Sequence, residues 1–152
     1  MINIAVLGYG TVGSGVVEVF FKNRESLQKK AGQELDLKYI LDVRDFPDSP
    51  FADRFTKDFN KILDDDSVKV VAEVIGGIEP SYGFTKACLE RGKSVVTSNK
   101  ELVAQRGAEL LAVAREHHCN YLFEASVGGG IPIIRPLHMC LAANQIDEIA
   151  GI

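Results

Sequence analysis

The sequence predicts an α/β protein with a doubly wound parallel sheet of the Rossmann type and helices on both faces. Three observations predict this fold. Apolar, strand-like segments alternate with helix-like segments along the 152-residue chain, and this order produces right-handed crossovers and a parallel sheet. A glycine-rich turn, Gly8–Gly13, directly follows the first apolar segment. The other glycine-rich or polar loops also follow expected strands: Gly76-Gly77, Ser98–Lys100 and Glu124–Gly130.

The first strand is expected over Ile2–Leu7, an apolar run that only Asn3 interrupts, as in strands buried on both faces. The turn that follows has the pattern G-x-G-x-x-G, with Gly8, Gly10 and Gly13. In dinucleotide-binding turns the first glycine permits the sharp turn. The second lets main-chain N–H groups approach a pyrophosphate, and the third lets the helix pack on the strand. The pattern alone is weak evidence, but its place between a strand and a helix strengthens it.

Further elements of the first half follow the same alternation. They are a helix from Thr11 to about Lys30, a strand over Leu37–Val43, a short edge strand over Ala52–Thr56 and a short helix over Asp58–Leu63. Gly32 is a typical helix stop, and the charges and prolines of Arg44–Pro50 indicate a loop. Asp64–Asp66 is expected to be the solvated end of the short helix, because successive side chains do not converge on one cation.

The second half continues the pattern. Expected are a strand over Val68–Ile75, a helix from about Ser81 to Arg91, a strand over Ser94–Thr97, a helix from Glu101 to about His118, a strand over Tyr121–Phe123, a helix from Pro132 to about Ala143 and the start of a strand over Gln145–Ala150. In open parallel sheets, ligands bind at the carboxyl ends of the strands. The unusual loops therefore predict one ligand crevice along that edge.

Composition narrows the class of protein. The length suits one domain with a substantial core, and the net charge of −4 argues against a nucleic-acid or acidic-membrane surface. No apolar run approaches the roughly 20 residues that span a bilayer. Met1 leads straight into the first expected strand, and the basic start and small-residue cleavage site of a signal peptide are not seen there, so none is expected. Cys88, Cys119 and Cys140 lack metal-type spacing and are expected to be reduced thiols in a cytoplasmic protein.

Arg44 lies just after the second expected strand, where the adenine ribose of a bound dinucleotide lies. An arginine there can pair with a 2′-phosphate, which favours NADP. Asp42 and Asp45 make the pattern mixed, so NAD and a merely solvated Arg44 stay open. Gly76-Gly77 indicates close approach of the cofactor to the main chain, with a tight turn before Pro80 as the alternative.

Two further stretches at the strand ends contain residues that can take part in catalysis or bind a cation. Lys100 follows a Thr-Ser-Asn run, and in a crevice its ammonium can hydrogen-bond or shuttle a proton; the alternative is a surface lysine in a first helical turn. Gly128-Gly129-Gly130 is unusually permissive for a strand-to-helix link. Its exposed carbonyls can coordinate a hard cation, and a flexible hinge is the competing interpretation.

The chain resembles the N-terminal, nucleotide-binding part of homoserine dehydrogenase over nearly its whole length. The stretches that carry the resemblance are GYGTVGSGV at 8–16, EVIGGIEP at 73–80, GKSVVTSNKELVA at 92–104 and FEASVGGGIPIIRPL at 123–137. Enzymes of this family interconvert L-homoserine and L-aspartate 4-semialdehyde with NAD(P)H, in the pathway to threonine and methionine. The last two stretches are far more specific than the glycine turn.

The resemblance implies a role for each matching residue. Gly8, Gly10, Thr11, Val12 and Gly13 would bind the pyrophosphate, and Arg44 would hold the 2′-phosphate of NADP. Gly76, Gly77 and Ser98 would line the nicotinamide side. Lys100 would be the catalytic residue between cofactor and substrate. Main-chain oxygens of Glu124, Val127, Gly129 and Ile131 would form a sodium site.

The family continues past Ile152 with a substrate and dimerisation region. Residues 1–152 are therefore expected to be the NAD(P)-binding domain of a longer enzyme, inactive alone, with a homodimer or homotetramer as the full-length form. A stand-alone, non-catalytic dinucleotide-binding or sensor module is the alternative, and it needs no chemistry at Lys100. A semialdehyde dehydrogenase with a cysteine nucleophile fits poorly, because no cysteine lies in a loop after a strand.

Overall fold

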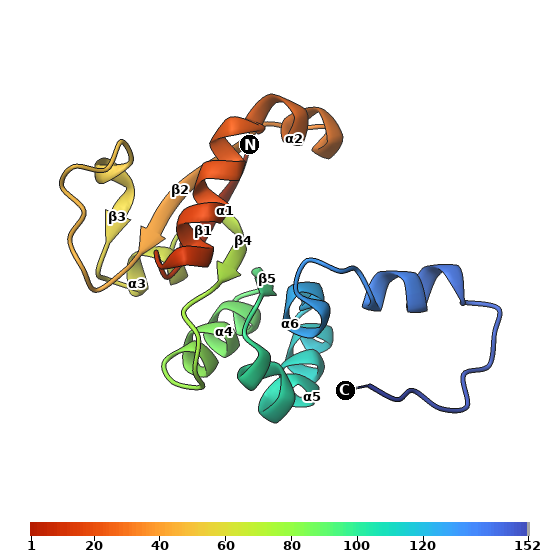
Figure 1. Ribbon diagram of the computed structural model, residues 1–152. Coiled ribbons are helices and arrows are strands. Elements are labelled where there is room, and N and C mark those ends of the chain that lie inside the picture. The colour runs from red at the N-terminus through yellow and green to blue at the C-terminus, as the bar shows by residue number, and fades with distance from the viewer. Residues whose placement is uncertain (152) are drawn as a thin grey trace.

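The computed structural model describes residues 1–151, whose six strands form one sheet in the order β3-β2-β1-β4-β5-β6 (Figure 1). Every neighbouring pair is parallel. The strands are β1 Ile2–Leu7, β2 Leu35–Leu41, β3 Phe55–Thr56, β4 Val68–Glu73, β5 Ser94–Thr97 and β6 Tyr121–Leu122. This order reverses between β1 and β4, which is the switch point where ligands bind in doubly wound sheets. The predicted fold class is confirmed.

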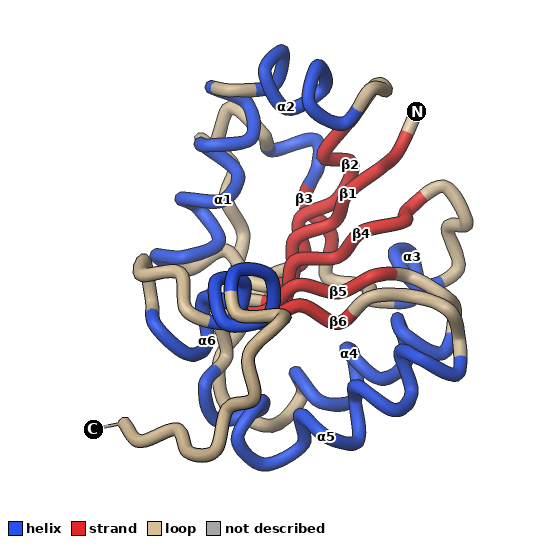
Figure 2. Tube along the Cα trace, turned by 90° about the vertical axis from the view of Figure 1, so that its right-hand side faces the viewer, coloured by secondary structure: helices blue, strands red, loops and turns tan. Residues whose placement is uncertain are grey.

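Helices cover both faces of the sheet (Figure 2). The helical elements are α1 Thr11–Lys22, α2 Arg24–Ala31, η1 Ala52–Arg54, α3 Asn60–Leu63, α4 Ser81–Glu90, α5 Lys100–Glu116, α6 Glu124–Gly128 and the π-helical turn η2 Pro136–Cys140. Helices α1 and α2 lie on one face, and α3, α4 and α5 lie on the other. None of the helices within residues 1–151 combines the length and apolar character that a membrane span needs.

Strand β1 lies at the centre of two apolar cores. Ala5 and Leu7 contact the cluster that includes Leu102 and Leu110 of α5, whereas Val6 contacts Val17 and Phe20 of α1 and belongs to the other cluster. All three β1 residues are buried. Because successive side chains of a strand point to opposite faces, a strand covered on both sides must be apolar throughout. That requirement explains the first apolar run of the sequence.

The expected N-terminal helix is in fact two helices, because the chain breaks at Asn23. The Asn23 side-chain amide donates to the main-chain oxygen of Val19 at 3.1 Å, and such side-chain bonds compete with regular helix. Gly32 ends α2 in the left-handed conformation, as expected. Strand β2 begins and ends two residues earlier than expected. It ends at Leu41 because the carboxylate of Asp42 accepts the main-chain N–H of Arg44 and turns the chain.

Asp65 is not solvated as expected. Its carboxylate accepts hydrogen bonds from the Lys38 ammonium at 2.6 Å, the Tyr39 hydroxyl at 3.0 Å and both the N–H and hydroxyl of Ser67. Burial acts to raise the pKa of Asp65, but these hydrogen bonds outweigh it and hold the pKa well below its usual range. Asp64 is exposed and pairs with Arg91, as a surface residue would.

The segment after β6 differs from expectation. The stretch that we expected to be a loop begins with helix α6, and the expected helix from Pro132 is reduced to a short helical segment around η2. Pro136 removes a main-chain donor inside that segment. Residues 145–150 form no strand, because no described strand lies beside them to pair with their main chain. In Figure 1 the chain after α6 lies apart from the sheet, and its last residues run back toward α5.

Candidate functional site

The glycine turn joins the end of β1 to α1 in very little space. Gly8 has φ +97°, and a Cβ there would lie 3.1 Å from Cα of Ile75. A Cβ on Gly13 would lie 1.9 Å from the main-chain oxygen of Gly8, which no real structure tolerates. Gly13 is therefore needed for α1 to pack against the turn, and Gly8 for the turn to pack against the segment that follows β4.

The N-terminus of α1 is open to an anion. Gly10 precedes the helix, and no side chain of residues 1–151 caps the first-turn N–H groups. A Cβ on Gly10 would meet nothing within 4 Å, and both Thr11 and Val12 are exposed. Helix α5, by contrast, is capped by Asn99, whose side-chain oxygen accepts the N–H of Leu102 at 3.1 Å. Free N–H groups and the helix dipole make the start of α1 suitable for a phosphate.

A pocket of about 440 Å³ lies beside this turn, at the ends of β2 and β3. Its lining residues are Asp42, Arg44, Asp45, Phe46, Pro47, Ala52, Phe55, Thr56 and Lys57. Phe46 and Phe55 stack at 4.8 Å, and the Tyr9 ring meets both of them edge-on. The pocket thus offers an aromatic wall beside basic side chains. Sequence reasoning missed Lys57, which pairs with Asp45 at 2.8 Å; its place after an edge strand was the available signal.

Arg44 is held in place rather than free in solvent. Its Nε donates to Asp42 Oδ1 at 3.0 Å, and its Nη2 donates to Asp42 Oδ2 and to the main-chain oxygen of Tyr9, both at 3.0 Å. The Tyr9 N–H also donates to Asp42 at 2.8 Å. The Arg44 side chain is nevertheless 58% exposed, so its binding of a 2′-phosphate stays a prediction beside the alternative of a solvated loop residue. The hydrogen bond from Arg44 is the main reason that the pKa of Asp42 falls to about 2.

The hydrogen bonds between Asp42 and Arg44, which we call the Asp42–Arg44 clamp, predict a pH dependence of stability. The pKa of Asp42 is lowered from 3.8 to about 2 in the folded chain. Its carboxylate therefore contributes fully to the free energy of unfolding above pH 3.8, and this contribution is lost as the pH falls through about 2. The lowering corresponds to about 1 to 2 kcal/mol once the exposure of Arg44 is allowed for. Asp42→Asn should be less stable than wild type by that amount at pH 7, with the difference vanishing near pH 2, as measured by urea unfolding.

The control for this prediction is Asp45→Asn. Asp45 is 80% exposed and pairs with an exposed lysine, so its substitution should leave the unfolding free energy unchanged at both pH values. An Asp42→Asn variant whose stability relative to wild type does not change with pH would contradict the clamp.

The other end of the same sheet edge carries Gly76, Gly77, Ser98 and Lys100. Both glycines have positive φ, at +90° and +73°, so the turn before Pro80 by itself accounts for them. Ser98 is half-buried between β5 and α5, and Lys100 is the first residue of α5. Lys100 is exposed, so the residues described here do not enclose it in the crevice that we expected.

The stretch from Glu124 to Ile131 divides into a helical part and a loop. Glu124 and Val127 lie in α6, whereas Gly129 and Ile131 lie in the exposed loop that follows. The Glu124 carboxylate accepts the N–H groups of residues 133, 134 and 135. These main-chain bonds, that of Ile133 first, lower the pKa of Glu124. The side chain thus folds the triple-glycine loop back onto α6.

The cysteines offer no nucleophile at this edge. Cys88 is fully buried in α4, and burial raises the pKa of its thiol to about 12. Burial also raises the pKa of Cys119, which follows α5, and Cys140 lies exposed in η2. All three are free thiols. A cysteine-dependent semialdehyde dehydrogenase therefore has no support in the described residues.

Comparison with known families decides the classification. The family model described as the NAD-binding domain of homoserine dehydrogenase matches residues 8–124, which is more than half of the 152-residue chain. The chain belongs to the homoserine dehydrogenase family. The homoserine dehydrogenase of Bacillus subtilis is 41% identical over 155 residues, covering 99% of this chain and 36% of that protein. The enzyme of Lactococcus lactis is 38% identical, with 99% of this chain and 36% of the relative covered.

Solved structures of homoserine dehydrogenases match the fold as well. The crystal structure of the enzyme from Thiobacillus denitrificans has a TM-score of 0.85 at 37% identity, covering 94% of this chain and 34% of that one. A hyperthermophilic archaeal homoserine dehydrogenase mutant in complex with NADPH has a TM-score of 0.73 at 26% identity. The match covers 90% of this chain and 47% of that one. The chain spans about a third of the length of the curated homoserine dehydrogenases that it matches.

Proposed function

We propose that residues 1–152 bind NADP(H) as the cofactor domain of an enzyme that interconverts L-homoserine and L-aspartate 4-semialdehyde by hydride transfer. The observation that carries the proposal is the uncapped N-terminus of α1 beside a pocket that holds Arg44. The first suits a pyrophosphate, and the second suits an adenosine with a 2′-phosphate. Gly8, Gly10, Thr11, Val12 and Gly13 would make up the pyrophosphate site.

The preference for NADP over NAD rests on Arg44. Its guanidinium already lies at the pocket wall, and a 2′-phosphate could replace one of its contacts to Asp42. A related archaeal enzyme has been solved with NADPH, which supports the same choice. NAD stays the alternative ligand, because Asp42 occupies the strand end from which an acidic residue would bind a free 2′-hydroxyl.

For the reaction, NADPH would supply the hydride that reduces the aldehyde carbon. Gly76, Gly77 and Ser98 would line the nicotinamide side of the crevice, because they follow β4, which pairs with β1 at the switch point, and β5, the next strand on that side. Lys100 would hydrogen-bond to the carbonyl oxygen of the substrate, or to the hydroxyl of homoserine in the reverse direction. Its exposure leaves it accessible to a substrate.

The remaining parts of the proposal concern the longer protein. Residues 1–152 would be one domain, followed by a substrate and dimerisation region, and the full-length enzyme would be a cytoplasmic homodimer or homotetramer. A sodium ion would bind to main-chain oxygens of Glu124, Val127, Gly129 and Ile131, since hard cations prefer oxygen ligands. Calorimetric titration with sodium chloride, against choline chloride, tests that site.

The experiment for the main proposal uses the purified chain. Calorimetry should detect binding of NADPH, while the same chain should reduce aspartate 4-semialdehyde negligibly in a spectrophotometric assay of NADPH oxidation. Absence of NADPH binding would refute the cofactor role, and rapid turnover would refute the need for a further region.

In the longer enzyme, Lys100→Ala should lose turnover and keep cofactor binding. Retained turnover would refute the catalytic role of Lys100. A longer protein that binds NADPH but has no turnover would instead be a sensor module.

A further inference from the structure

We propose that Glu73, through Thr97 and Asn99, is the positioning residue for the nicotinamide half of the cofactor. It would hold the Gly76-Gly77 turn and the Ser98–Lys100 segment in one fixed arrangement. The inference deepens the proposed function and rests on it.

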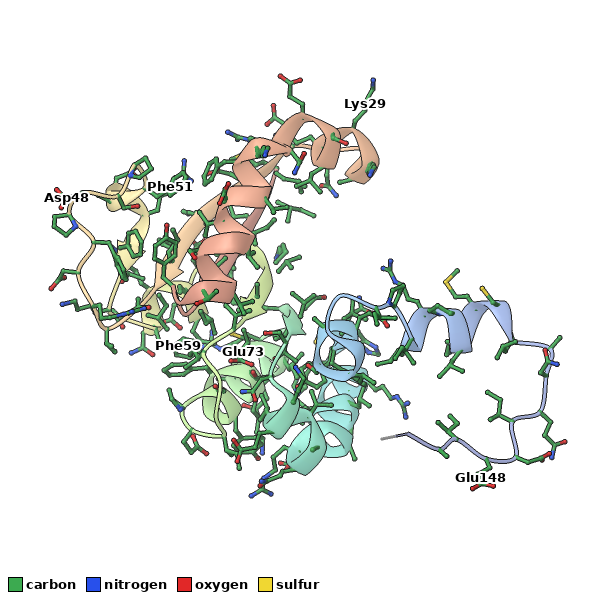
Figure 3. The ribbon with its side chains drawn as sticks, viewed as in Figure 1. Lys29, Asp48, Phe51, Phe59, Glu73 and Glu148 are labelled. Carbon is green, nitrogen blue, oxygen red and sulfur yellow. The ribbon has the colours of Figure 1, made fainter. Side chains whose placement is uncertain are left out.

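Glu73 is the last residue of β4 and is completely buried. Figure 3 shows its side chain in the interior of the molecule. No lysine or arginine of residues 1–151 forms an ion pair with it. A buried carboxyl group is costly unless hydrogen bonds satisfy its oxygens. What those bonds hold in place therefore indicates the function of Glu73.

The first oxygen of Glu73 holds the start of the glycine turn after β4. Oε1 accepts the main-chain N–H of Ile75 at 2.9 Å. Ile75 is the residue against which Gly8 lies, since a Cβ on Gly8 would come within 3.1 Å of Cα of Ile75. Glu73 thus fixes a contact between the pyrophosphate turn and the loop after β4.

The second oxygen reaches the end of β5. The Thr97 hydroxyl donates to Glu73 Oε2 at 2.6 Å and accepts the main-chain N–H of Asn99 at 2.9 Å. The Asn99 amide then donates to the main-chain oxygen of Gly77 at 2.6 Å, and its side-chain oxygen caps α5. Thr97 and Asn99 are both nearly fully buried.

The bonds therefore form a closed loop from Glu73 through Thr97 and Asn99 back to Gly77. Ser98 and Lys100 are the residues on either side of Asn99, so their main chain is held by this loop. The Ser126 hydroxyl adds a bond to the Thr97 main-chain oxygen at 3.0 Å, which attaches α6. Fully satisfied buried networks of this kind impose a single arrangement of the main chain. The adenosine pocket at β2 and β3 takes no part in it.

The test exploits this separation between the two halves of the cofactor. Thr97→Val removes the hydroxyl with little change of shape, and Thr97→Ser keeps the hydroxyl. The affinity of the purified chain is measured for NADPH and for adenosine 2′,5′-bisphosphate, which lacks the nicotinamide half. Thr97→Val should weaken NADPH about tenfold and leave the bisphosphate unchanged, whereas Thr97→Ser should bind both ligands as wild type does.

Thr85→Val is the matched control. Thr85 is a fully buried threonine of α4 whose hydroxyl has no hydrogen-bond partner among the described residues. The same substitution there should leave both affinities unchanged. Glu73→Gln is the second variant, should Thr97→Val fail to fold by circular dichroism, and it should show the same selective loss of NADPH.

The outcomes separate the inference from the proposed function. If Thr97→Val and Glu73→Gln bind NADPH as well as wild type does, only the inference is overturned. Equal weakening of NADPH and the bisphosphate would also overturn it, because a general loss of structure affects both halves. Wild type that binds neither ligand would refute the proposed function, and the inference with it.

Discussion

The Gly13→Ala variant is expected to lose most of its stability. The new methyl group would lie 1.9 Å from the Gly8 oxygen and 2.9 Å from the Gly8 carbonyl carbon. Both obstacles are main-chain atoms between β1 and α1, so no flexible side chain can move aside to relieve the overlap. Helix α1 would have to shift off the sheet and withdraw Val17 and Phe20 from their core. We expect a cost of about 3 kcal/mol or more in the free energy of unfolding, measured with urea.

Two alanine variants of neighbouring glycines are controls for this prediction. Gly15 lies inside the same helix, and a Cβ there meets nothing within 4 Å, so Gly15→Ala should raise stability by about 0.5 to 1 kcal/mol. Gly10→Ala should leave stability nearly unchanged for the same reason, yet weaken NADPH, because its methyl group would project toward the phosphates. A Gly13→Ala variant as stable as Gly15→Ala would refute the assigned packing of α1.

The Arg44→Ala variant is expected to reverse the cofactor preference. Wild type should bind NADPH more tightly than NADH, because a guanidinium forms charge-assisted bonds with a 2′-phosphate. Loss of those bonds should weaken NADPH by about 10- to 100-fold. The same change releases the Asp42 carboxylate from its two bonds to the Arg44 side chain, so NADH should bind as well as or better than before. Calorimetric titration with both nucleotides measures the ratio.

Arg91→Ala is the matched control. The Arg91 side chain is 56% exposed, against 58% for Arg44, and it too pairs with an aspartate, Asp64. It lies at the end of α4, away from the strand-end loops. Its removal should leave the ratio of NADPH to NADH affinity at the wild-type value. An Arg44→Ala variant with an unchanged ratio of NADPH to NADH affinity would show that Arg44 does not bind the 2′-phosphate.

Local patterns predicted the elements that depend on neighbours in the chain. The run Ile2–Leu7, the glycine stop at Gly32 and the strand Ser94–Thr97 are where we expected them. Each depends on apolar periodicity or turn chemistry within a few residues. The same reasoning placed the glycine turn and Lys100 on one edge of the sheet, because the carboxyl ends of parallel strands share an edge.

The expectations that were wrong concern residues whose partners are distant in sequence or absent. Asp65 is held by Lys38 and Tyr39, more than 25 residues away, so its local setting at a helix end was misleading. Residues 145–150 have strand-like composition but no neighbouring strand with which to pair. Helix α6 replaces an expected loop, with Ser126 bonded to Thr97, 29 residues earlier.

The sequence by itself determined the fold class, the family resemblance and the edge of the sheet at which a ligand would bind. Each follows from short motifs and from the alternation of strands and helices. Only the tertiary structure decided that Asp42 clamps Arg44, that α1 lacks a cap and that Glu73 joins two loops across 24 residues of sequence. The physical reason is that a hydrogen bond depends on the spatial approach of its two groups. The partners of a buried carboxyl group in an apolar strand therefore cannot be predicted from the residues next to it in the sequence.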